Sequence, residues 1–167
     1  SASSYGMSST IEMRPRVSLV GVGTGVKLIA LDGWTTADPM IRYPLLESEE
    51  IIHQSWVRNL GINCNKLANV GVHALNWQEP GGMDNVVISG AIKYGLHLEG
   101  RTVDRIDAQI MHCYFSNLWI IPLVGTGWQD ADWRGIYAES TVGTISFENV
   151  TITGDPAPDP NTGQCIE

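Results

Sequence analysis

The chain has 167 residues, of which 43% are hydrophobic and only 17% are charged. This length is typical of one domain, and the apolar share is large enough for a core, which excludes general disorder. The formal net charge of −8 repels phosphates, so no nucleic-acid partner is expected, and no run of 18 apolar residues predicts insertion into a membrane.

Short runs rich in β-branched residues are separated by glycine- and proline-containing turn signals along most of the chain. The runs predicted to be strands cover residues 18–20, 26–29, 57–62, 85–88, 103–114 and 145–153. Residues 45–55 are the one window where a short helix competes with a strand. Cys64 and Cys113 lie in apolar strand contexts and are predicted to be buried thiols, whereas the state of Cys165 is left open.

Two short patterns recur in the predicted strands. The first is Asn-(Leu/Val)-x-Ile, at residues 59–62, 85–88 and 149–152. The second is Gly-aliphatic-(His/Tyr)-(Ala/Leu), at residues 71–74, 95–98 and 135–138. Spacings of 26 residues from Ile62 to Ile88, 22 from Ile88 to Ile110 and 24 from Gly71 to Gly95 indicate stacked coils.

The predicted fold is therefore all-β, a right-handed parallel β-helix in which each coil buries its apolar face against the next. Strand alternation predicts that His73, His97 and Tyr137 point outward, followed two positions later by Glu99 and Glu139. The uneven period leaves a β-sandwich as the alternative.

The first coils carry a family resemblance. Residues 5–13 read YGMSSTIEM and residues 14–23 read RPRVSLVGVG. Together with the later repeats up to Ile152, they resemble the pectate-lyase-like parallel β-helices, a group that includes phage tailspikes and tail fibres. The resemblance covers most of the chain as a fold signature, and its motifs are too degenerate to identify one activity.

This resemblance implies a segment of a longer protein or an unusually short member of the group. The β-helix coils are expected over residues 1–154 and a proline-rich extended arm or linker over residues 155–167. It also implies a viral tailspike or tail-fibre component located in the virion tail or outside the cell. The implied partners are a host cell-surface polysaccharide and further copies of the chain in a homotrimer, or other tail proteins. The alternative is a secreted polysaccharide hydrolase or lyase of cellular origin.

Carboxylates and loop aromatics are the candidate site residues. Glycoside hydrolysis uses two carboxylates that flank the bond, and the candidates are Asp130, Asp132, Glu99 and Glu139. Tryptophan rings stack on sugars and polar neighbours bind hydroxyls, so two loops are candidate glycan contacts: Trp77, Gln78, Trp128, Gln129, Trp133 and Arg134. The alternative for these loops is a turn insertion packed over the coils or in a subunit interface.

Whether the chain is an enzyme is not decided by these residues. Hydrolysis is favoured over lyase chemistry, because no set of aspartates surrounds Arg101, Arg105 or Arg134 at coil spacing. No cofactor is expected. No metal site is predicted either, because His73 and His97 have no carboxylate that the sequence alone places beside them.

Overall fold

The computed structural model describes residues 3–23, 25–46, 51–100, 110–122, 133–140 and 143–153, which form strands and connecting turns without a helix. The all-β prediction is thus confirmed, and within these residues no helix has the length and apolar character needed to cross a membrane. The strands are β1 (Ser4–Met7), β2 (Ile11–Glu12), β3 (Leu19–Val20), β4 (Lys27–Ala30), β5 (Ile41–Tyr43), β6 (Trp56–Asn63), β7 (Val70–Ala74), β8 (Trp77–Ser89), β9 (Tyr94–Gly100), β10 (Ile110–Ile121), β11 (Arg134–Ser140) and β12 (Ile145–Ile152).

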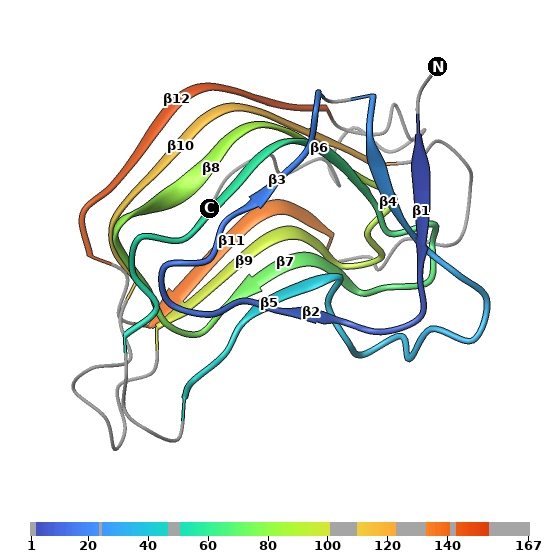
Figure 1. Ribbon diagram of the computed structural model, residues 1–167, viewed down its shortest axis with the longest axis horizontal. Helices are drawn as coiled ribbons and strands as arrows, with labels where there is room; N and C mark the ends of the chain where they lie inside the picture. Colours follow the sequence, from blue (N-terminus) through green and yellow to red (C-terminus); the bar gives the residue numbers. More distant parts are fainter. Residues whose placement is uncertain are drawn as a thin grey trace.

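These strands form two sheets in which neighbouring strands run parallel (Figure 1). Sheet A has the order β1-β4-β6-β8-β10-β12, with β3 also paired to β6, and sheet B has the order β11-β9-β7-β5-β2. From β4 onward the chain visits the two sheets alternately, so consecutive strands of one sheet are joined through a strand of the other. The parallel pairing excludes an antiparallel β-sandwich for the described residues.

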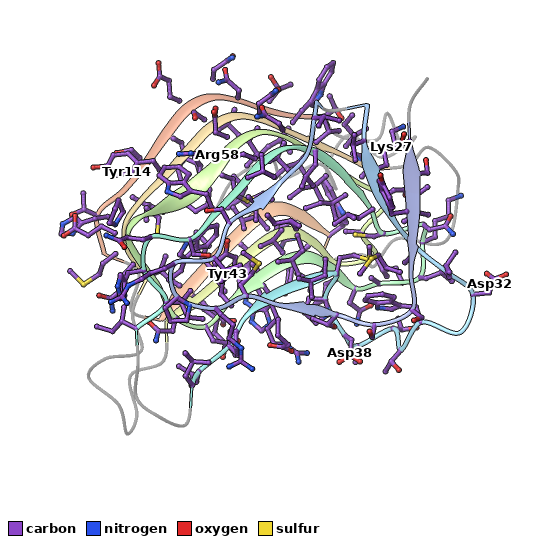
Figure 2. The ribbon with its side chains drawn as sticks, in the orientation of Figure 1. Lys27, Asp32, Asp38, Tyr43, Arg58 and Tyr114 are labelled. Atoms are coloured by element: carbon purple, nitrogen blue, oxygen red, sulfur yellow. The ribbon has the colours of Figure 1, made fainter. Side chains whose placement is uncertain are left out.

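The core lies between the two sheets. Residues at matched register form rows across sheet A, and one such row joins the fully buried Val57, Met83 and Phe115. Phe147 of β12 continues this row and stacks on Phe115, but 43% of its surface is exposed. Figure 2 shows Tyr43 between the sheets, whereas Tyr114 projects from the outer side of sheet A. Because strand side chains alternate, each apolar row inside implies a second, solvent-facing row outside.

Four asparagines shape sheet A. Asn59, Asn85, Asn117 and Asn149 all have φ between 51° and 55°, the left-handed region that asparagine tolerates better than most residues. Each asparagine interrupts its strand at the same level, and the inward row restarts at the residue that follows it. That residue is buried in β6, β8 and β10 and half-buried in β12. The sequence pattern was recognised at three of these asparagines, within predicted strands, and the fourth, Asn117, begins the same pattern on β10.

The glycines of the second pattern lie where the two sheets approach each other. A Cβ atom at Gly71 would come within 2.5 Å of Ile88 Cγ2, and one at Gly95 would overlap Cγ2 of Ile120. Each of these isoleucines closes an Asn-x-x-Ile pattern on sheet A, so the two patterns meet at one corner of the fold. The space left there admits no side chain.

Two predictions about chain segments need correction. Ile88 lies beside Ile120, not Ile110, because the step from β8 to β10 is 32 residues. The described part of the window 45–55 is neither helix nor strand, and β6 begins only at Trp56. Residues 155–167, the predicted arm, lie outside the described residues.

Candidate functional site

A polar groove opens on the outer side of sheet A, over the row of asparagine turns. Its volume is about 560 Å³, and its lining consists of Asn59, Asp84, Asn85, Asn117, Leu118, Trp119, Asn149 and Thr151. The groove exists because every asparagine turn occurs at the same level of its strand, which aligns the side-chain amides across neighbouring strands.

Hydrogen bonds between neighbouring strands hold these amides in place. Asn85 Nδ2 donates to Asn59 Oδ1 at 2.9 Å, and Asn149 Nδ2 donates to Asn117 Oδ1 at 2.7 Å. Side chains ordered in this way lose less entropy when a ligand binds them. The groove therefore offers a fixed set of amide donors and acceptors.

Asp84 contributes the charged group of the groove. Its Oδ1 accepts hydrogen bonds from Ser116 Oγ at 2.8 Å and from Asn117 Nδ2 at 3.0 Å. The hydrogen bonds from Asn117 and Ser116 lower the pKa of Asp84, because they stabilise its ionised form. Asp84 is therefore a carboxylate at neutral pH.

Trp119 supplies an aromatic surface beside these polar groups. It lies on β10 between Val87 of β8 and Thr151 of β12 in an outward-facing row, and 49% of its surface is exposed. Its neighbours Leu118 and Ile120 point inward and are almost fully buried. An exposed indole next to amides and a carboxylate can stack on an apolar ring face while the polar groups bind hydroxyls.

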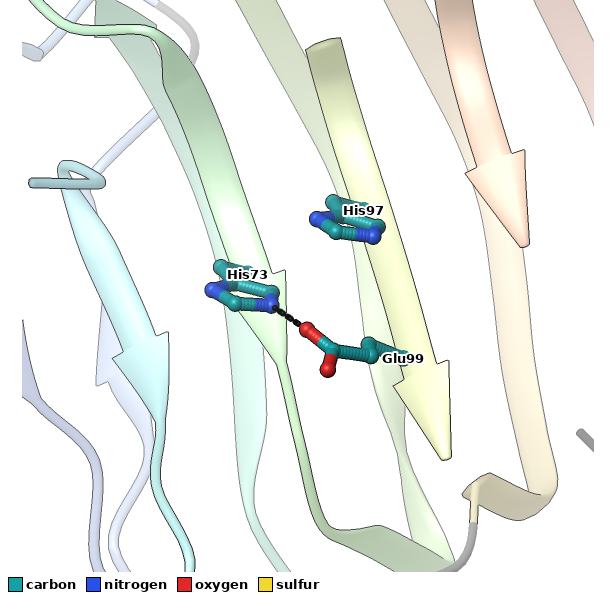
Figure 3. Close-up of side chains that lie close together, drawn as sticks. All are labelled: His73, His97 and Glu99. Carbon is teal, nitrogen blue, oxygen red and sulfur yellow. Dashed lines mark hydrogen bonds and ion pairs between the residues drawn. The ribbon is translucent and has the colours of Figure 1, made fainter. Parts of the chain in front are cut away.

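A second cluster lies on the outer side of sheet B. His73 of β7 and His97 of β9 are paired in register, and their rings stack with centroids 4.5 Å apart. Glu99 Oε2 lies 2.9 Å from His73 Nε2 (Figure 3), and Glu139 Oε1 lies 2.7 Å from His97 Nε2. Each histidine thus contacts a glutamate on the next strand of sheet B. That glutamate lies two residues after the residue that is paired with the histidine.

The electrostatics of this second cluster follow from its packing. Burial lowers the pKa of His73, the charge of His97 lowers it further, and the hydrogen bond to Glu99 opposes both effects. The hydroxyl of Tyr137 donates to Glu139 Oε2 at 3.3 Å. The negative charge of Glu139 raises the pKa of Tyr137.

The predicted carboxylate candidates are only partly placed. Glu99 and Glu139 are paired in register on β9 and β11, so the prediction that they share one row is confirmed. The sequence missed the contact of each glutamate with a histidine, because strands far apart in the chain supply the partners. Asp130 and Asp132 lie outside the described residues.

The predicted tryptophan surface is wrong at its first member. Trp77 is fully buried, stacked on Tyr43 with ring centroids 3.8 Å apart, and its indole nitrogen donates to the Ser55 carbonyl at 3.1 Å. It therefore offers no ring face to a ligand. The adjacent Gln78 is half-buried.

Arg134 is the first residue of β11 in sheet B, Trp133 immediately precedes it, and both are half-buried. Arg134 donates to the backbone carbonyl of Trp133 at 3.2 Å. Trp128 and Gln129 lie outside the described residues. The exposed indole that the sequence analysis did not select is Trp119, and its signal was the unrecognised fourth Asn-x-x-Ile copy at residues 117–120.

Comparison with known proteins identifies no family for the chain and no function for the groove or the histidine cluster. No family model matches the chain, and no curated protein has a similar sequence.

Proposed function

We propose that the chain is part of a right-handed parallel β-helix whose sheet A groove binds a polysaccharide. Parallel pairing throughout the two sheets and alternate visits to them support the fold proposal. A right-handed connection is the usual one between parallel strands. The resemblance of residues 5–23 to tailspike-type proteins supports a role in the tail of a phage, where the groove attaches the particle to a host-surface glycan.

The glycan proposal is carried by one observation: the exposed ring of Trp119 lines the groove beside the asparagine side chains. The groove is open and mostly polar, and it follows neighbouring strands across sheet A. An extended chain of sugars fits such a groove better than a compact apolar ligand does. The asparagine amides bind hydroxyls, while the indole of Trp119 stacks on the apolar face of a sugar ring.

The charge of the groove favours a neutral or amino-sugar glycan over a polyanionic one. Asp84 is ionised, and the chain as a whole carries a net charge of −8. An acidic polysaccharide would be repelled by both. Arg58, the charge that acts on Asp84, stacks over Trp56 at 3.9 Å and does not line the groove.

The test is calorimetric titration with a panel of neutral, amino-sugar and acidic bacterial polysaccharides, comparing Trp119→Ala with Tyr114→Ala. Both aromatics lie on β10 and both are 49% exposed, but only Trp119 lines the groove. Loss of a central tryptophan contact is expected to cost about 2 kcal/mol, roughly 30-fold in affinity. Tyr114→Ala should bind as the parent does. Equal losses in both variants, or no binding across the panel, would refute the proposal.

The same panel decides between adhesion and depolymerisation. Adhesion predicts binding without release of new reducing ends and without absorbance near 235 nm from unsaturated uronate. Release of reducing ends that disappears in Glu99→Gln would instead support a hydrolase acting on sheet B. Sedimentation analysis of the same preparation tests the proposed homotrimer.

A further inference from the structure

The cluster of His73, His97 and Glu99 brings three potential metal ligands to one point on sheet B (Figure 3). One ligand atom from each side chain lies within 4.8 Å of the other two. Parallel pairing sets this arrangement, because the two histidines occupy equivalent positions on β7 and β9 and Glu99 follows two residues after His97. The side chains of the two histidines are 18% and 10% exposed, so the cluster is sheltered and still open to solvent.

We propose that His73, His97 and Glu99 bind one divalent transition-metal ion, with zinc as the best match. Two imidazoles and one carboxylate are an established donor set for zinc, with water in the fourth position. Zinc–ligand bonds of about 2.0–2.2 Å place tetrahedral ligands roughly 3.3–3.5 Å apart. The ligand atoms therefore need to approach one another by no more than about 1.5 Å from their present separations.

Small side-chain rotations supply this approach. The imidazole planes are within 3° of parallel, so their nitrogen lone pairs do not converge on one point in the described conformation. Rotation of each ring about its Cβ–Cγ bond opens the stack into a wedge with both nitrogens facing the ion. This torsion has a broad intrinsic energy profile in histidine. The ring of His97 turns against the rings of Tyr94 and Tyr137, whose centroids lie 4.9 and 5.3 Å from its own.

The charges around the cluster suit a cation. Glu139 places a second carboxylate 2.7 Å from His97 Nε2. Arg42, the neighbour of His73 on β5, forms ion pairs with Glu12 at 3.0 Å and Asp38 at 3.2 Å. These ion pairs offset part of the positive charge of Arg42, although that charge still lowers the pKa of His73. The carboxylates of Glu99 and Glu139 balance the two charges of the ion.

The test is titration of the full chain, prepared without a polyhistidine tag, with zinc chloride by calorimetry. We expect one ion per chain. His73→Ala, His97→Ala and Glu99→Gln should each weaken binding by at least about 10-fold, the lower limit seen even for residues that only support a ligand. The matched control is His112→Asn, because His112 lies 3.2 Å from Glu79 and, among the described residues, belongs to no group of three potential metal ligands. Its affinity for zinc should be unchanged.

A measurement on the unmodified chain keeps the proposal testable if a variant fails to fold. Zinc should shift the ring nitrogen resonances of His73 and His97 at one equivalent, and Co²⁺ should give the visible absorption of a tetrahedral site. Absence of a stoichiometric ion, shifts confined to His53 and His112, or full affinity in Glu99→Gln would overturn the proposal. The inference does not depend on the glycan-binding groove, which lies on sheet A.

Discussion

Replacing Gly135 by alanine tests how the two repeat patterns meet. A Cβ atom at this position would overlap Cγ2 of Ile152 and lie 3.1 Å from its Cδ1. The three nearest atoms all belong to that one side chain, and a β-branched residue cannot turn Cγ2 away without changing χ1. The clash should therefore cost stability that only a change at Ile152 can restore.

The magnitude follows from two opposing effects. Overpacking of this kind costs about 1–3 kcal/mol, whereas exchanging glycine for alanine stabilises by about 0.4–1 kcal/mol through the unfolded chain. We expect Gly135→Ala to lower the free energy of unfolding by about 1–2 kcal/mol. In an Ile152→Ala background the clash is gone, so the same substitution should become neutral or stabilise by up to about 1 kcal/mol.

Urea unfolding of the four proteins in this cycle measures both effects. With a slope near 2 kcal/mol/M, Gly135→Ala should lower the midpoint by roughly 0.5–1 M without changing the slope. The coupling between the two sites should be about 1–3 kcal/mol. A stabilising Gly135→Ala in the parent chain, or equal effects in both backgrounds, would refute the contact between the two patterns.

Three further outcomes follow from the core and the groove. Trp77→Ala should cost about 3–5 kcal/mol in chemical denaturation, because it removes a fully buried indole and its hydrogen bond; a loss below 1 kcal/mol would contradict the burial. Burial raises the pKa of Cys64 and of Cys113 to about 12, so in a Cys165→Ser variant a thiol reagent at pH 8 should label neither until denaturant is added. Asp84 has a pKa below its ordinary value, so its contribution to stability is present above about pH 4 and is lost as pH falls through the lowered pKa. Thermal unfolding between pH 2 and 6 should therefore show a weaker acid dependence in Asp84→Asn, and identical curves would argue against the hydrogen bonds to Asp84.

The repeat patterns were sufficient to predict how most strands align. The shared glycine and the aliphatic residue after it placed His73, His97 and Tyr137 in one row, and the structure pairs them in that row. Alternation turns the residue before each histidine to the opposite side of the strand, and Val72 and Leu96 are accordingly buried. These features depend on strand periodicity, which is a local property of the chain.

The exposure of the tryptophans could not be predicted in this way. Trp77 precedes a segment rich in turn residues, which suggested an exposed loop, but β8 begins at Trp77 itself and turns the indole onto Tyr43. Trp119 lies in an apolar run, yet it faces outward and is 49% exposed. Whether each indole is buried or exposed depends on which side of its strand faces the other sheet.

The sequence by itself therefore determined the strand periodicity, the asparagine turns and the glycines of the second pattern. Each of these features reflects the backbone preference or the size of single residues. The groove and the histidine–glutamate cluster were decided by the tertiary structure. The hydrogen bonds and ion pairs between strands in these two places join residues that lie 26 to 42 positions apart in the chain, as in His73–Glu99 and His97–Glu139. Only the register between parallel strands brings such residues together, and that register is set by core packing between the two sheets.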